Sequence, residues 1–296
     1  MKDRLTELGY AAGWRLVRTL PLPAARAIFN AAADRAARGN GPGTQRLRRN
    51  LRQVVGPDMG DAELDELVRA GLRSYARYWM EAFRLPSQSR EQFLDGFHLV
   101  NEEELHKAVA DGKGVVLALP HVGNWDAAAA WLVSHDYKMI TVAERLRPEG
   151  LFERFVAYRE KLGMEVLPLT GGERPPLDVL AERLVQGWAV ALLADRDLSA
   201  RGVEVRFFGG RTRMPPGPAL LALRTGAPLF AADIWFSPER AMARVRRIEP
   251  ATEGALDVRV KETTQRMADA FEVGIAEHPQ DWHMLQKLWL DQSARV

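Results

Sequence analysis

The amino-acid sequence predicts an α/β fold with a mostly parallel central sheet flanked by helices and preceded by amphipathic N-terminal helices. From residue 99 onward, short apolar runs alternate with helical patterns, which is typical of strands joined by helical crossovers. The 296 residues are 47% hydrophobic and 27% charged, an ordinary globular composition. No linker, repeat or low-complexity tract divides the chain, so we predict one domain over 1–296 with its α/β core in 99–296.

The first part of the chain predicts helices. We expect a helix over 3–38 interrupted at Pro21 and Pro23, a basic helix over 43–55, and a longer helix over 61–84 that ends before Pro86. The second half of the long helix, SYARYWMEAFRL, carries an aromatic cluster at helical spacing. Such a cluster indicates a buried helix face or the wall of a groove for a long apolar ligand.

The remaining elements alternate along the core. We predict helices over 101–111, 124–134, 148–162, 175–187, 216–225 and 255–277, and strands over 114–119, 138–143, 164–169, 188–194, 203–208, 228–236 and 241–248. A Gly/Pro-rich loop is expected between the strand at 203–208 and the helix at 216–225.

Charge is distributed unevenly. The formal net charge is +2, but residues 1–57 hold eleven Lys or Arg against three Asp or Glu. These basic residues are mixed with Trp, Tyr and Leu, which favours either a helix lying on an anionic membrane surface or the solvated face of an ordinary helix. The rest of the chain is acidic and has no nucleic-acid motif, so we predict no nucleic-acid binding. No apolar run is long enough to span a bilayer, and no signal peptide begins the chain.

The most informative segment is VVLALPHVGNWDAAAAWL at 115–132. An apolar strand ends at His121, Gly123 permits a tight turn, and Asn124 and Asp126 suit the start of a helix. An imidazole can take and return a proton near neutral pH, and a carboxylate can hold its tautomer. The spacing H-x-x-x-x-D therefore predicts a general base, His121, oriented by Asp126.

Other acidic residues follow neighbouring strands. Glu144 follows the strand at 138–143, and Asp195 follows the strand at 188–194. Parallel strands gather such side chains at one edge of the sheet, so we expect both near His121. The chain has no cysteine, which excludes disulfides, thiolate metal sites and a Cys nucleophile. The other histidines show no metal-ligand spacing, and we predict no metal site.

The ordered set of motifs resembles the bacterial lipid A and lysophospholipid acyltransferases that share an H-x-x-x-x-D box. Within that family it is most similar to the actinobacterial phosphatidylinositol mannoside acyltransferases. The stretches that carry the resemblance are RLRRNLRQVVG, SYARYWMEAFRLP, PHVGNWDAAAAW, AERLRPEGLFERFVAYRE, LLADRDL, FFGGRTRMPPGPALLALRTGAPL and HPQDWHMLQKLW.

The resemblance implies a peripheral enzyme on the cytoplasmic face of the plasma membrane. Its co-substrate would be acyl-CoA, with no further cofactor, and its glycolipid acceptor would offer a mannose hydroxyl. The family pattern assigns the base to His121, its orienting carboxylate to Asp126, and a third acid to Asp195. It places Glu144 and Arg159 near the acceptor head group.

Further substrate contacts are expected at the turn and in the Gly/Pro-rich loop. Asn124 and the backbone N–H groups of 122–125 could face the reacting carbonyl. Arg211 and Arg213 could bind phosphates of coenzyme A or of the lipid, or could be solvated loop residues.

Direct transfer in a ternary complex, without an acyl-enzyme, fits a chain that lacks cysteine and a nucleophile elbow. The alternatives are an acyltransferase for a lipid A precursor or a lysophospholipid, a hydrolase that releases fatty acid, and an inactive lipid-binding membrane protein.

Overall fold

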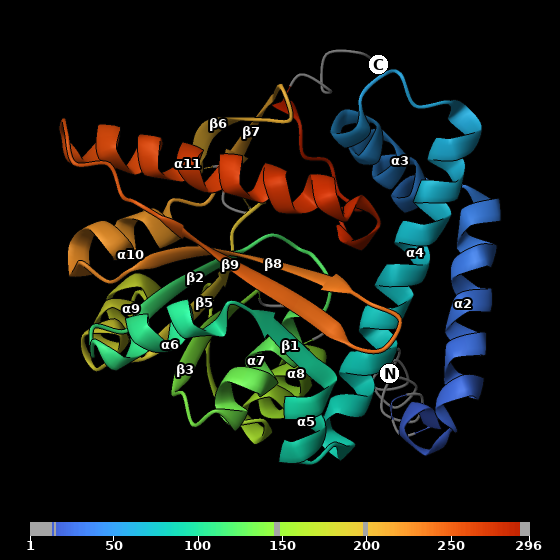
Figure 1. Ribbon diagram of the computed structural model, residues 1–296, viewed down its shortest axis with the longest axis horizontal. Coiled ribbons are helices and arrows are strands. Elements are labelled where there is room, and N and C mark those ends of the chain that lie inside the picture. The colour runs from blue at the N-terminus through green and yellow to red at the C-terminus, as the bar shows by residue number, and fades with distance from the viewer. Residues whose placement is uncertain (1–13, 15, 145–148, 198–200, 291–296) are drawn as a thin grey trace.

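A seven-stranded sheet forms the centre of the computed structural model, which describes residues 14, 16–144, 149–197 and 201–290 (Figure 1). The strand order is β1-β9-β8-β2-β5-β3-β4. The bounds are β1 Phe97–Val100, β2 Val115–Leu119, β3 Met139–Ala143, β4 Met164–Pro168, β5 Ala189–Leu193, β8 Leu229–Phe236 and β9 Ala241–Ile248. Among the described residues of this sheet, β8 and β9 are the one pair that runs antiparallel, so the predicted mostly parallel sheet is confirmed.

Helices cover both faces of this sheet. One face carries α6 (Glu102–Ala110), α7 (Trp125–Ser134) and α8 (Glu149–Lys161). The other carries α9 (Pro176–Val185), α10 (Gly217–Thr225) and α11 (Leu256–Glu277). This arrangement follows from the predicted alternation of strands and helices, because crossovers between parallel strands lie on the faces of a sheet.

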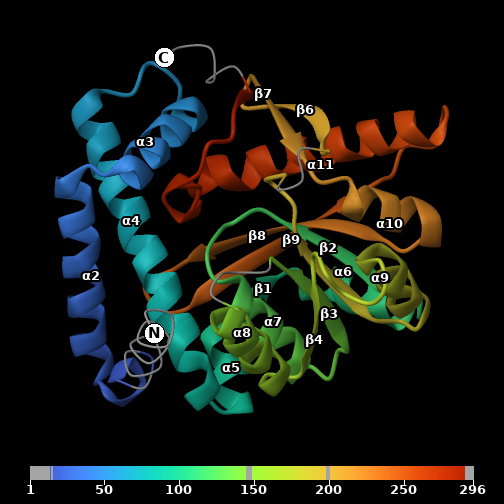
Figure 2. The same cartoon turned by 180° about the vertical axis from the view of Figure 1, so that it is seen from behind.

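The N-terminal helices form a layer beside the sheet. Figure 2 shows α2 (Leu22–Gly39), α3 (Pro42–Val55) and α4 (Asp61–Arg84) grouped on one side of the molecule. Their contact is a small apolar cluster that includes Leu47, Leu51 and Leu64. The predicted interruption at Pro21 is confirmed, but the one at Pro23 is wrong, because Pro23 lies in the first turn of α2. Residues 1–13 and 15 lie outside the described residues. No helix among those described has the length and apolarity needed to cross a bilayer.

Short elements escaped the sequence prediction. Helix α5 (Arg90–Gly96) begins with a capping box formed by Ser89 and Gln92 and leads into β1. The predicted Gly/Pro-rich loop is wrong over most of its length, because β7 (Gly210–Met214) pairs with β6 (Val203–Phe207) in a separate hairpin. Phe208 and Gly209 form the two-residue turn of this hairpin, with positive φ angles of 46° and 74°.

The loop after β2 lies tightly against β8. Gly123 has a φ of 54°, and a Cβ atom there would come within 2.7 Å of the carbonyl oxygen of Ile234. Its N–H donates to the carbonyl of Asp281 at 2.9 Å. Glycine is therefore required at this turn, which fixes the path of the chain from His121 into α7.

A buried carboxylate behind this loop makes stability depend on pH. Asp233 on β8 accepts a hydrogen bond from Arg246 Nε at 2.9 Å, while its Oδ1 has no partner among the described residues. Burial raises the pKa of Asp233 from 3.8 to about 6. Because the pKa is raised in the folded protein, the associated stability is present at low pH and is lost as the pH rises through about 6.

We compare the free energies of unfolding of Asp233→Asn and of the unsubstituted protein at each pH. Between about pH 4.5 and pH 8, the difference should shift by about 2 kcal/mol in favour of the variant. Urea unfolding at several pH values measures this change. The control is Asp58→Asn, which changes an exposed carboxylate and should show no such trend. A difference at Asp233 that does not vary with pH would contradict the prediction.

Candidate active site

His121 and Asp195 meet at the carboxyl edge of the sheet. Strands β2 and β5 are parallel neighbours whose register pairs Leu119 with Leu193, so each side chain lies two residues beyond a paired position. His121 Nδ1 lies 2.6 Å from Asp195 Oδ1, and the His121 backbone N–H donates to Asp195 Oδ2 at 3.0 Å. The expectation that Asp195 lies at the site of His121 agrees with this geometry.

The carboxylate of Asp195 is fully buried, and both of its oxygens accept hydrogen bonds. Besides the two groups of His121, the indole Nε1–H of Trp282 donates to Oδ2 at 2.9 Å. Burial by itself would raise the pKa of Asp195, but the attraction of His121 and these hydrogen bonds outweigh burial, and the pKa is lowered. Asp195 is therefore ionised at neutral pH and accepts the hydrogen bond that Nδ1–H of His121 donates.

This contact determines the tautomer of the imidazole. With Nδ1–H donated to Asp195, the neutral ring presents the lone pair of Nε2 away from the carboxylate. The side chain of His121 is 24% exposed, so Nε2 belongs to a ring that solvent or a substrate can reach. The arrangement is that of an oriented general base.

The predicted pairing of His121 with Asp126 is wrong. Asp126, in the first turn of α7, accepts from Arg159 Nε at 2.8 Å through Oδ1 and from Tyr78 Oη at 3.0 Å through Oδ2. Arg159 on α8 and Tyr78 on α4 thus occupy both carboxylate oxygens. Five residues carry the chain from the strand end into a helix, and this turns Asp126 toward those helices and away from the ring of His121.

Asp126 instead joins three helices around the site. Burial, and then the nearby carboxylate, raise the pKa of Tyr78 well above 10.0, so the phenol remains a donor. The pKa of Arg159 is raised, because its pairing with Asp126 outweighs the effect of burial. The predicted site residue Arg159 therefore lies beside Asp126 as its charged partner, with its side chain 17% exposed.

The other predicted substrate contacts lie as follows. Asn124 is the N-cap of α7, where its Oδ1 accepts from the Ala127 N–H at 3.0 Å and its Nδ2 donates to Glu81 at 3.0 Å. This buried side chain therefore has a capping position. Glu144 is exposed at the end of β3, with one oxygen 3.5 Å from Arg196.

Arg211 and Arg213 lie on the exposed side of strand β7, so their placement in a loop is corrected. Arg211 forms an ion pair of 3.0 Å with Glu204 on β6.

Two of the four backbone donors expected to face the reacting carbonyl are already used. The N–H of Val122 donates to the carbonyl of Pro120 at 2.8 Å, and that of Gly123 donates to Asp281. The N–H groups of Asn124 and Trp125, where α7 begins, remain as the candidate donors that would bind an oxyanion.

An apolar cavity lies next to this site. Trp125, whose ring centroid is 5.7 Å from that of His121, forms part of its wall. The other lining side chains are apolar and come from β1, β2, β5, β8, β9, α6 and α7: Phe97, Leu99, Leu105, Leu117, Leu119, Ala128, Ala129, Trp131, Leu132, Ala191, Ala232, Ile234, Ala243 and Val245. The lining suits hydrocarbon, and the cavity volume of about 50 Å³ has room for only a few carbons of an acyl chain unless its walls move apart.

Sequence reasoning missed Tyr78 and Trp282 as parts of the site. Tyr78 lies in the aromatic cluster of α4, which was interpreted as core or groove wall, and only its contact with Asp126 shows its place. Trp282 lies 87 residues from Asp195, so no local pattern could join them. Among the described residues, no group of three His, Asp or Glu side chains is arranged to hold a metal ion.

Comparison with known proteins identifies the family of the chain. Residues 4–291 match the family described as bacterial lipid A biosynthesis acyltransferase. The chain is 51% identical over 287 residues to the phosphatidylinositol mannoside acyltransferase of Mycolicibacterium smegmatis, covering 97% of this chain and 92% of that protein. It is 49% identical to the protein of the same name from Mycobacterium tuberculosis, covering 96% and 89%. With its site at the carboxyl edge of a mostly parallel sheet, the chain belongs to the family of bacterial lipid A biosynthesis acyltransferases.

Proposed function

We propose that this acyltransferase moves a long-chain acyl group from acyl-CoA to a mannose hydroxyl of a phosphatidylinositol mannoside. The names of its relatives support the acceptor. The observation that carries the proposal is the 2.6 Å contact between His121 and Asp195, because it directs Nε2 of a partly exposed imidazole away from the carboxylate, beside an apolar cavity.

The reaction needs one base and no covalent enzyme intermediate. Nε2 of His121 takes the proton of the sugar hydroxyl while the hydroxyl oxygen attacks the thioester carbonyl carbon. The resulting imidazolium is stabilised by ionised Asp195. The C–S bond then breaks, the imidazolium returns the proton to the leaving sulfur, and coenzyme A departs as the thiol. The absence of cysteine from the chain is consistent with this direct transfer.

We propose that the acyl chain binds in the apolar cavity, because Trp125 in the cavity wall lies beside His121, the proposed base. Glu144, Arg211 and Arg213 remain our proposed contacts for the polar parts of the substrates, with Arg159 and Asn124 behind them.

Narrowing the cavity should shorten the preferred acyl chain. Ala128→Phe places a ring where the wall is now a methyl group, so the cavity can no longer widen to admit a long chain. We expect kcat/KM for palmitoyl-CoA relative to octanoyl-CoA to fall about tenfold or more. The octanoyl donor is the internal control, and an unchanged ratio would show that the acyl chain binds elsewhere.

We also propose that residues 1–57 contact an anionic membrane surface, with the enzyme peripheral on the cytoplasmic face of the plasma membrane. Helix α2 exposes Ile28, whose side chain projects into solvent, and Leu22. Arg35 follows Ile28 by seven residues and so lies on the same helix face. An exposed apolar residue among arginines is suited to a lipid interface.

Removing two of these charges should weaken membrane binding. Each basic residue near an anionic surface contributes about 1 kcal/mol, so Arg35→Gln/Arg38→Gln should lower the affinity for phosphatidylglycerol vesicles by about 30-fold. Vesicle sedimentation measures the affinity. The control is Lys113→Gln/Arg247→Gln, which removes two exposed charges outside the N-terminal helices. Equal losses in both double variants would reject a membrane contact by α2.

An assay with palmitoyl-CoA and phosphatidylinositol mannoside tests the proposed reaction. We expect coenzyme A release that requires the mannoside and yields its acylated product. Transfer only to a lipid A precursor or a lysophospholipid would replace the acceptor. Release of free fatty acid would indicate a hydrolase, and vesicle binding without turnover would indicate a lipid-binding protein.

A further inference from the structure

A C-terminal segment runs directly behind the catalytic loop. Residues 281–283 lie antiparallel to 121–123, with a bridge between Val122 and Trp282. The carbonyl of Asp281 accepts from the Gly123 N–H at 2.9 Å, and the N–H of His283 donates to the His121 carbonyl at 2.8 Å. The backbone of His121 is therefore held on both sides of this bridge.

The side chain between these two bonds reaches the catalytic pair. Trp282 is fully buried, and its Nε1–H donates to Asp195 Oδ2 at 2.9 Å. Its ring lies against Phe207, with centroids 6.0 Å apart and the planes nearly perpendicular. Packing thus fixes the indole plane, and the indole N–H fixes one oxygen of the carboxylate that orients His121.

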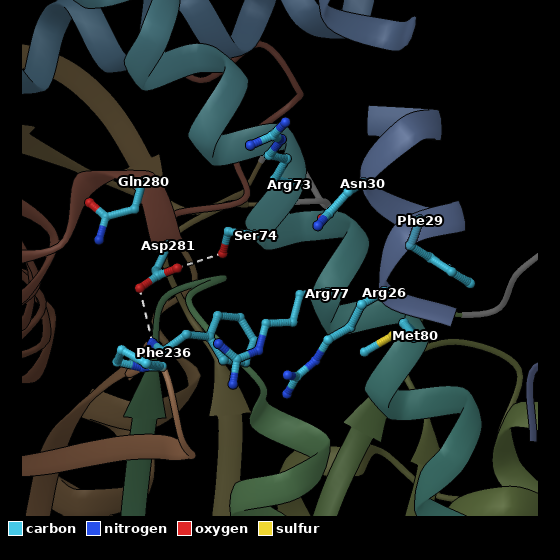
Figure 3. Close-up of a pocket in the computed structure, with 11 residues that line it drawn as sticks. Arg26, Phe29, Asn30, Arg73, Ser74, Arg77, Met80, Phe236, Gln280 and Asp281 are labelled. Carbon is cyan, nitrogen blue, oxygen red and sulfur yellow. Dashed lines mark hydrogen bonds between the residues drawn. The ribbon is translucent and has the colours of Figure 1, made fainter. Parts of the chain in front are cut away.

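The same segment is anchored on helix α4. Ser74 Oγ donates to Asp281 Oδ1 at 2.5 Å, and the Phe236 N–H donates to Asp281 Oδ2 at 3.0 Å (Figure 3). His283 Nε2 lies 2.9 Å from the same Ser74 oxygen. Burial lowers the pKa of His283 to about 3, so this ring is neutral and adds no charge next to the catalytic pair.

We infer that Trp282 is a positioning residue for catalysis, which holds Asp195 in the orientation that directs the imidazole of His121. The inference rests on the proposed role of His121 as the base. The segment 281–283 is itself held in place, because Ser74 binds Asp281 and the backbone hydrogen bonds join the segment to the loop of His121.

A positioning role has a signature that packing alone lacks. The indole bond to Asp195 is stronger when the neighbouring imidazole is neutral, since the carboxylate then carries an uncompensated charge. Removing the indole donor therefore favours the imidazolium, and the acid limb of the kcat profile should move to higher pH. Among the described residues, the titratable groups that act on the ring of His121 are Asp195, which follows β5, and the neutral His283 from the C-terminal segment.

The test compares Trp282→Phe with Trp289→Phe. Trp289 is also a buried tryptophan against Phe207, but its indole nitrogen has no hydrogen-bond partner among the described residues. Both variants remove a buried indole, and only the first removes a bond to Asp195. For Trp282→Phe we expect kcat to fall about tenfold, KM for the acyl donor to change less than about twofold, and the acid limb to move to higher pH.

Two further measurements keep the test decisive. Replacing Trp282 by benzothienylalanine retains the ring shape without the N–H, and it should reproduce the Trp282→Phe kinetics even if the phenylalanine variant folds poorly. The titration of His121 followed by ¹⁵N NMR needs no turnover, so it is separate from the identity of the acceptor. Kinetics and a titration that match Trp289→Phe would overturn the positioning role.

Discussion

His121→Ala should lower kcat by about 10²–10⁴-fold, because the hydroxyl of the acceptor then attacks without a base to take its proton. KM for the acyl donor should change little, since the apolar cavity and its wall at Trp125 remain. Steady-state release of coenzyme A over a range of acceptor concentrations measures both constants.

The matched control removes an imidazole that has no part in the site. His98 is exposed on β1, and His98→Ala should keep the full kcat. Vesicle binding should be the same in both variants, which separates loss of chemistry from loss of the membrane contact. A residual kcat within about tenfold of the unsubstituted enzyme would show that His121 is not the base.

Asp195→Asn should lower kcat by about 10³–10⁴-fold, and the hydrogen bonds explain why. Oδ2 of Asp195 accepts from two donors, the backbone N–H of His121 and the indole of Trp282, so the amide oxygen must occupy that position. The amide NH₂ then faces Nδ1 and forces the proton of the ring onto Nε2. The imidazole loses its free lone pair on the side that faces away from residue 195.

The matching variant at the other carboxylate should act mainly on stability. Asp126→Asn leaves Arg159 as a buried cation with a weakened partner, which costs about 3 kcal/mol or more when such a pair is broken. We therefore expect a large loss in the free energy of unfolding with a much smaller loss of kcat than at position 195. Denaturant unfolding beside steady-state kinetics measures this contrast. If kcat falls as far for Asp126→Asn as for Asp195→Asn and stability is unchanged, then Asp126 orients His121, as the sequence predicted.

Local sequence patterns predicted most of the architecture. Strand β2 and helices α3, α4 and α11 lie within about two residues of their predicted bounds, because periodicity, prolines and helix-capping residues act over a few neighbouring positions. The short strands β1 and β7 were missed because neither is an apolar run: β1 contains His98, and β7 carries Arg211 and Arg213. The family and the position of His121 at a strand end also followed from sequence motifs alone.

What the sequence by itself determined is thus the α/β fold, the imidazole at the end of β2 and the acids that follow the neighbouring strands. Only the tertiary structure decided which carboxylate meets the imidazole. Asp126 is near His121 along the chain but turns with α7 toward Arg159, whereas Asp195 reaches Nδ1 because β5 pairs with β2 in a register that aligns the two strand ends. Strand pairing and the return of Trp282 depend on packing between segments that are distant along the chain, and spacing between neighbouring residues does not encode such contacts.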